Sequence, residues 1–154
     1  MKSSIWIDKE YKSYYCEGRN SGIALYMDVD LPERIVVFVP KITDWLRKKY
    51  YFPIRCSVFV RNVKQFLASK EASPCKGVFF APAEQTKEVP QIYIAAKSLT
   101  THEFAFTLLH ELTHYYQWYF LEDERRTSRS LEIEANRYAD YLCDLFADQT
   151  GYEE

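Results

Sequence analysis

Residues 99–120 read LTTHEFAFTLLHELTHYYQWYF, and the fold expected for the chain follows from this segment. Thr100 and Glu103 have the spacing of a capping box, in which two side chains satisfy the free N–H groups at the start of a helix. Apolar side chains then recur at helical spacing, at Phe104, Leu108, Leu112, Tyr115 and Tyr119. No Gly or Pro interrupts residues 99–126. The stretch therefore predicts a long, mostly buried helix.

The centre of this helix carries the pentapeptide His110-Glu111-Leu112-Thr113-His114. On a helix, His110 and His114 lie one turn apart and point the same way, so each can give one nitrogen to a single ion. Glu111 then lies at the rim, where a carboxylate can take a proton from water on the metal. The alternative is a pair of core histidines bonded to neighbouring carbonyls, with Glu111 in a surface ion pair. The helical context favours the metal site.

Two histidines do not complete a zinc site, so a third ligand is needed. His102, the only other histidine, lies two turns upstream on the same helix and cannot turn back onto the ion. The next helical segment, residues 130–143, reads SLEIEANRYADYLC and supplies two carboxylates, Glu132 and Glu134.

Glu132 and Glu134 flank the apolar stripe of that segment on opposite sides, each about 80° from its centre. Asn136 follows Glu132 by one turn, and the small residues Ala139 and Cys143 continue the same flank, which can approach another helix closely. We therefore expect Glu132 to be the third ligand and Asn136 to place an amide behind a liganding histidine, with Glu134 in reserve. The ordinary alternative for both glutamates is a solvated helix face.

HELTH followed by Glu132-Ile133-Glu134-Ala135-Asn136-Arg137-Tyr138-Ala139 resembles the gluzincin peptidases. The resemblance covers residues 77–146 and is nearest in motif to the ImmA/IrrE-like group, which pairs an HExxH helix with an ExEANxFA stretch; Tyr138 replaces the phenylalanine. The HExxH region is also similar to SprT-like proteases, which carry a downstream zinc ribbon, but this chain has no CxxC. The gluzincin resemblance implies Zn²⁺ on His110, His114 and Glu132, with Glu111 as general base and Asn136 behind a ligand.

The region before the HExxH helix is expected to complete an α+β, minimal zincin-like metallopeptidase domain with a small mixed sheet. Asp30-Leu31-Pro32-Glu33 predicts the start of a helix that continues to about Tyr50, is kinked or split at Pro40 and has ended by Pro53. Alternation predicts strands at 54–60, 77–81 and 91–95. The segment 90–96 either lines the cleft and holds an extended peptide by backbone pairing or is an interior strand.

Residues 1–29 form an N-terminal extension that the sequence leaves undecided. Segments 4–7 and 23–27 have strand composition and flank a polar loop at 17–22. They can extend the sheet, cap the cleft or form a partner surface.

Length and composition favour a single domain over residues 1–154. A net charge of −2 and scattered basic residues argue against a nucleic-acid partner. There is no N-terminal apolar run and no stretch of membrane-spanning length, so we expect a cytoplasmic protein away from membranes. The four cysteines lack metal or redox spacing and are expected to be free thiols. The oligomeric state is not encoded in a recognisable pattern.

These patterns predict a zinc-dependent metallopeptidase that acts on a peptide or protein substrate. The alternative is a regulatory or latent zincin-fold protein that binds metal and a protein partner with little general proteolysis. In a latent form, the acidic tail at 150–154 would reach the metal. Tyr93, Tyr138 and Tyr141 are candidates to polarise the scissile carbonyl, although tyrosines are more often core residues.

Overall fold

A mixed sheet of four strands and three helices makes up the α+β fold of the described residues. The computed structural model describes residues 5–8, 22–66, 75–83, 88–120 and 126–152. The elements follow in the order β1 (Ile23–Met27), α1 (Glu33–Lys49), β2 (Cys56–Arg61), β3 (Gly77–Phe80), β4 (Gln91–Ala95), α2 (Thr101–Phe120) and α3 (Ser128–Thr150). All three expected strands, both expected C-terminal helices and the helix after Pro32 are confirmed, with boundaries that shift by a few residues.

The strands lie in the order β1-β2-β4-β3. β1, β2 and β4 are parallel, whereas β3 pairs with β4 in the antiparallel direction. β4 therefore has a partner on each side, and its backbone cannot receive an extended peptide. Of the two interpretations of segment 90–96, the interior strand is correct and the peptide-holding strand is wrong. The edge strand next to β4 is β3.

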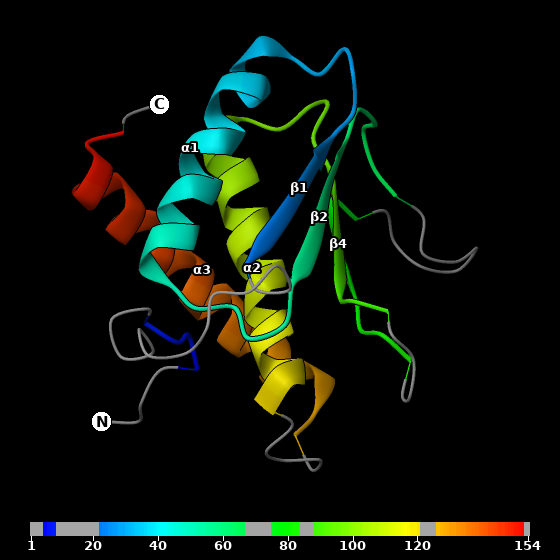
Figure 1. Cartoon of the computed structure of the whole chain (residues 1–154), viewed down its shortest axis with the longest axis vertical. Helices are drawn as coiled ribbons and strands as arrows, with labels where there is room; N and C mark the ends of the chain where they lie inside the picture. The colour runs from blue at the N-terminus through cyan, green and yellow to red at the C-terminus, as the bar shows by residue number, and fades with distance from the viewer. Residues whose placement is uncertain (1–4, 9–21, 67–74, 84–87, 121–125, 153–154) are drawn as a thin grey trace.

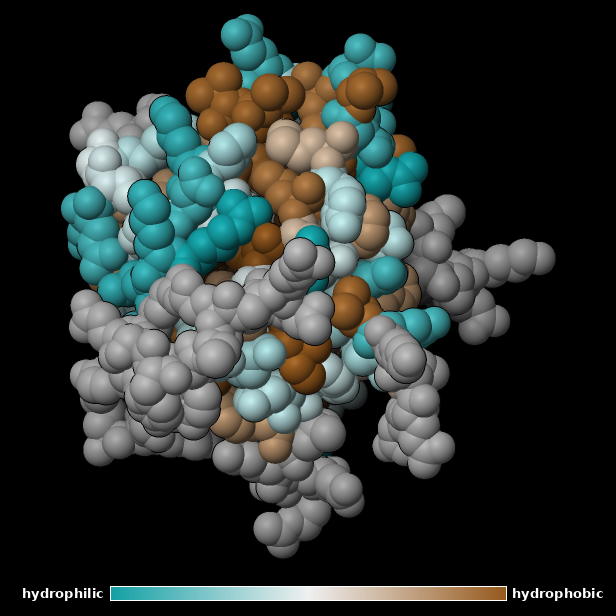
Figure 2. All heavy atoms as spheres, in the orientation of Figure 1, coloured by the Kyte–Doolittle hydropathy of each residue, from teal (hydrophilic) through white to brown (hydrophobic). Residues whose placement is uncertain are grey.

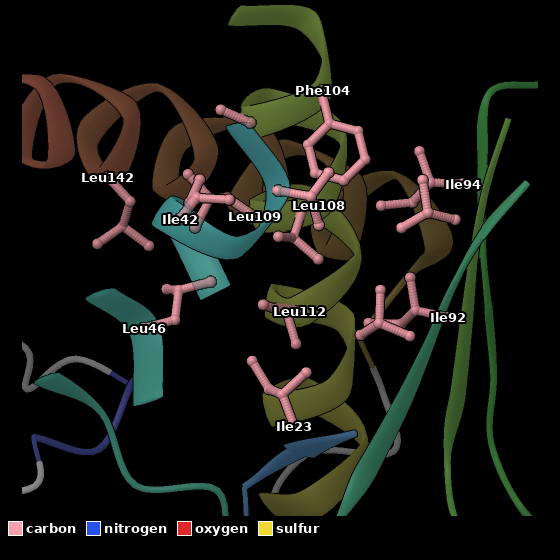
Figure 3. Packing of buried hydrophobic residues seen from close by; sticks show 14 of the residues in the cluster. Ile23, Ile42, Leu46, Ile92, Ile94, Phe104, Leu108, Leu109, Leu112 and Leu142 are labelled. Atoms are coloured by element: carbon pink, nitrogen blue, oxygen red, sulfur yellow. The ribbon is translucent and has the colours of Figure 1, made fainter. Parts of the chain in front are cut away.

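The three helices pack on one side of the sheet, as Figure 1 shows. Inward-pointing residues of β2 and β4, including Val58, Ile92 and Ile94, are fully buried against them. Figure 3 shows leucines of α2 at the centre of this core, between α1 and α3 on one side and β4 on the other. α2 is thus surrounded by the sheet and two helices, and its backbone is fixed by packing on most of its circumference.

The N-terminal extension contributes to this core. β1 adds a parallel strand beside β2, so segment 23–27 extends the sheet. Trp6 is buried, its ring lies 4.8 Å from that of Tyr116, and its Nε1 donates to Thr113 Oγ1 at 3.2 Å. Residues 5–8 form no strand, only a single bridge between Asp8 and Tyr50. Ser4 and the loop at 17–21 lie outside the described residues.

α1 continues through Pro40 without a break, so the expected split does not occur. Pro40 is exposed, and the carbonyl that loses its helical hydrogen-bond donor belongs to Val36, which also faces solvent. Water can replace the missing donor there. The helix begins after Pro32 without a side-chain cap, and Asp30 instead adopts a positive φ of 64°.

The other face of the sheet carries a row of aromatic side chains. Phe59 stacks between Tyr26 and Tyr93, with ring centroids 4.9 and 4.7 Å apart. Hydrophobic side chains are also exposed around the start of α1, where Figure 2 shows a hydrophobic area at the top of the molecule. Among the described helices, none has the length and apolar character that crossing a membrane requires.

Candidate metal centre

Local sequence signals position the two helices that build the site. The capping box at the start of α2 forms as expected: Thr100 N–H donates to Glu103 Oε1 at 2.9 Å, and Glu103 N–H donates to Thr100 Oγ1 at 3.1 Å. Thr127 caps α3 by accepting from Ser130 N–H. α2 and α3 share the most extensive contact between any two elements of the fold. The HELTH motif and the two candidate glutamates therefore face one another.

Three side chains converge between these helices. Nε2 of His110 and Nε2 of His114 are 3.2 Å apart. Glu132 places Oε2 at 3.1 Å from Nε2 of His110 and Oε1 at 2.8 Å from Nε2 of His114. Two atoms that each lie about 2.0–2.1 Å from one tetrahedral ion are about 3.3 Å apart, so this triangle has nearly the size of a zinc ligand set.

The hydrogen-bond network fixes which nitrogen of His114 carries the proton. Nε2 of Gln117 donates to Leu131 O and to Glu134 Oε1, both at 2.9 Å, and both partners are acceptors. Oε1 of Gln117 therefore faces Nδ1 of His114 at 2.7 Å, and Nδ1 must be the donor. In neutral His114, Nε2 is left with a lone pair.

That lone pair points at a carboxylate oxygen and at a second imidazole. A proton on Nε2 of His110 can point either at Nε2 of His114 or at the Glu132 carboxylate. A cation between the two Nε2 atoms and that carboxylate attracts all three groups. His110, Glu111 and His114 also place one ligand atom each within 4.8 Å of one another and could hold a metal ion. The donor set thus fits a divalent metal on geometric and electrostatic grounds.

His110 is largely buried, with 14% of its side chain exposed. Burial, followed by the neighbouring His114, lowers the pKa of His110, while Glu132 and the Asn136 amide act in the opposite direction. Asn136 thus lies close to His110. Nδ1 of His110 is buried and has no hydrogen-bond partner of standard geometry among the described residues. A neutral ring is the form that binds metal.

Glu111 is buried between α2 and the edge strand. Its side chain lies against Gly77 of β3, where a Cβ atom would meet Glu111 Oε2 at 3.0 Å and Thr107 Cγ2 at 2.6 Å. Burial and, secondarily, the charge of Glu132 raise the pKa of Glu111 to about 8. The absence of a side chain at Gly77 is what allows β3 to approach the carboxylate this closely.

Glu134, the reserve ligand, is engaged elsewhere. Its Oε1 accepts from Gln117 at 2.9 Å and from Arg126 Nη1 at 2.8 Å. Helical periodicity left Glu132 and Glu134 equivalent, and the packing of α3 on α2 separates them. Gln117, which bonds to both His114 and Glu134, was not anticipated; its position three residues after His114, on the same helix face, is the signal that could have indicated it.

The three candidate tyrosines lie in two different parts of the fold. Tyr93 is on the sheet face opposite α2, where its hydroxyl donates to Gln91 Oε1 at 3.3 Å. Tyr138 and Tyr141 line a cavity of about 590 Å³ together with Arg126, Glu134 and Arg137.

Comparison with known proteins gives no relative: no family model, no curated protein and no solved structure matches this chain.

Proposed function

We propose that this protein is a zinc-dependent peptidase in which His110, His114 and Glu132 hold the metal and Glu111 is the general base. The observation that carries the proposal is the triangle of two imidazole nitrogens and one carboxylate, with a fixed lone pair on His114 directed into it. Two histidines and one glutamate form a catalytic rather than a structural zinc set, because only three protein ligands are used.

A zinc ion bound by these residues would activate a water molecule near neutral pH and polarise a carbonyl oxygen. Glu111 lies next to His110 in sequence and directs its carboxylate toward the strand side of the site. Its pKa of about 8 describes the metal-free protein, and a nearby cation favours the ionised form. Glu111 can then accept the proton of water and return it to the departing amine.

The edge strand β3 supports a peptide as substrate. β3 is an outer strand of the sheet, and a Cβ atom added at its residue Gly77 would lie 3.0 Å from Glu111 Oε2. An extended peptide that pairs with an edge strand gains backbone hydrogen bonds that do not depend on its side chains. A chain held along β3 would pass next to Glu111. In this account β3 takes the role first assigned to segment 90–96.

The arrangement of a mixed sheet, an HExxH helix and a glutamate helix also supports a zincin-like assignment of the fold. The latent alternative, in which the tail reaches the metal, gains no support. Tyr152 packs on Phe38 of α1, with ring centroids 4.8 Å apart, and lines a cavity with His102, two turns upstream of His110. Glu153 and Glu154 lie outside the described residues.

The test combines metal content with hydrolysis of a peptide library derived from a proteome. Wild-type protein should retain one zinc per chain and cleave peptides, His114→Ala should lose the metal, and Glu111→Gln should retain the metal but lose at least about 10²-fold in rate. His102→Ala is the matched control, because this exposed histidine lies on the same helix outside the triangle. An unchanged rate in Glu111→Gln would refute the proposal.

A further inference from the structure

Gln117 connects two of the three candidate metal ligands. On one side its Oε1 accepts from Nδ1 of His114 at 2.7 Å. On the other side its Nε2 donates to Leu131 O and to Glu134 Oε1, the positions that flank Glu132 on α3. One amide therefore bonds to the ring of a ligand on α2 and to the helix turn that carries a ligand on α3.

Glu132 depends on this connection more than a buried ligand would. Its side chain is 55% exposed, and the contacts that the structure gives its carboxylate are those to the two histidines. The position of its carboxylate is therefore set by where α3 lies against α2. Gln117 contributes hydrogen bonds to that helix contact on both sides of Glu132.

Arg126 and Glu134 extend the network at the start of α3. Arg126 donates from Nη1 to Glu134 Oε1 at 2.8 Å and from Nη2 to Ser130 O at 3.1 Å. Because Glu134 Oε1 already accepts from Arg126 and Leu131 O can only accept, the Gln117 amide cannot flip without losing both of its acceptors.

We infer that Gln117 is a positioning residue for the metal centre: through Glu134 and Leu131 it fixes the tautomer of His114 and the placement of Glu132 together. The effect on metal binding rests on the proposed function. The hydrogen bonds of Gln117 do not depend on it. Partners behind metal-bound histidines are worth about 10–100-fold in metal affinity, and Gln117 acts on two ligands.

The experiment measures zinc affinity by competition with a chromophoric chelator and the His114 tautomer by ¹⁵N NMR of the metal-free protein. In wild type we expect the Nδ1–H form of His114. Gln117→Leu should weaken zinc binding about 10–100-fold and shift His114 toward the Nε2–H form. Gln149→Leu is the matched control, since Gln149 is also a helix glutamine that accepts a hydrogen bond, from Trp45 Nε1 at 3.0 Å, away from the metal centre.

A reciprocal pair of variants separates positioning from general stability. Gln117→Glu leaves an oxygen facing the acceptors Glu134 and Leu131 O, so it should weaken zinc binding as Gln117→Leu does. Adding Glu134→Gln restores a donor between the two side chains, although not toward Leu131 O, and should recover part of the lost affinity and of the Nδ1–H form. If Gln117→Leu fails to fold, this pair of variants still tests whether Gln117 positions the metal ligands.

Zinc affinity within about twofold of wild type in Gln117→Leu, or no recovery in the reciprocal pair, would overturn the inference. Different results would refute the proposed function. A wild-type protein that binds no zinc, or a Glu111→Gln variant with full activity, would refute the peptidase, whereas the tautomer of His114 still reports on Gln117.

Discussion

In the metal-free protein, the burial of Glu111 opposes the ionisation that its proposed role as a base requires. A base beside a cation must be able to ionise, yet Glu111 is only 7% exposed and has its pKa raised to about 8 by burial and by Glu132. Its placement against Gly77 therefore destabilises the charged form until a cation is nearby. Functional carboxylates often carry such a cost.

The raised pKa of Glu111 makes the free energy of unfolding of the metal-free protein depend on pH. In the metal-free protein at pH values between 4.5 and about 8, folded Glu111 keeps its proton while the unfolded chain releases it, so stability falls as pH rises through this window. Glu111→Gln cannot titrate and escapes the loss. The free energy of unfolding, measured by urea with a chelator present, should favour the variant over wild type more at pH 9 than at pH 5, by on the order of 3 kcal/mol. An equal difference at both pH values would contradict the buried, protonated state.

The two candidate glutamates of α3 should also differ. Glu132→Ala removes a ligand and should abolish zinc binding at micromolar zinc, as seen by equilibrium dialysis. Glu134→Ala removes an acceptor of Gln117 and should weaken binding without abolishing it, by about 10–100-fold. The reverse order would make Glu134 the ligand.

At the scale of elements, the close approach of β3 to α2 depends on one glycine. A Cβ atom at Gly77 would lie 2.6 Å from Thr107 Cγ2, a contact that forces the strand or the helix to move. Overpacking of this kind costs about 1–3 kcal/mol. The strand that we propose to hold the peptide is thus placed by the absence of a side chain.

Gly77→Ala should lower the free energy of unfolding by about 1–3 kcal/mol in urea denaturation. Thr107→Ser removes Cγ2 and keeps the hydroxyl that donates to Glu103 O, so the double variant should recover part of the loss. If the two changes in the free energy of unfolding simply add in the double variant, the contact with Thr107 Cγ2 is not the cause of the destabilisation.

The elements that could be predicted from sequence are those with local signals. The capping box at Thr100 and the apolar periodicity place α2, and alternation finds β2, β3 and β4. Strand order is a different matter, since nothing local shows that the antiparallel strand β3, rather than β4, lies at the edge. Likewise, the continuity of α1 through Pro40 depends on which side of the helix faces water.

Across the whole fold, local sequence signals also predict only part of the candidate metal centre. The spacing of HELTH alone predicts that His110 and His114 point the same way, because the helix supplies their geometry. The separation of Glu132 from Glu134, and the connection through Gln117, arise from the packing of α3 on α2, which residue spacing does not encode. The sequence likewise left the role of β1 and Trp6 undecided, because both acquire it through partners distant in the chain.

Zinc binding should stabilise the entire fold, because the proposed metal ligands come from both α2 and α3, which pack in one core. Zinc at about 100 times its dissociation constant adds about 2.7 kcal/mol, which for a chain of this size raises Tm by roughly 5–11 °C. Differential scanning calorimetry with and without a chelator measures the shift. His114→Ala should show none, and a shift of equal size in that variant would place the zinc elsewhere.

The most direct measurement is anomalous diffraction at the zinc absorption edge from crystals of the zinc-treated protein. We expect one strong peak within bonding distance of Nε2 of His110, Nε2 of His114 and a carboxylate oxygen of Glu132. A peak at any other position, or no peak between these three side chains, would contradict it.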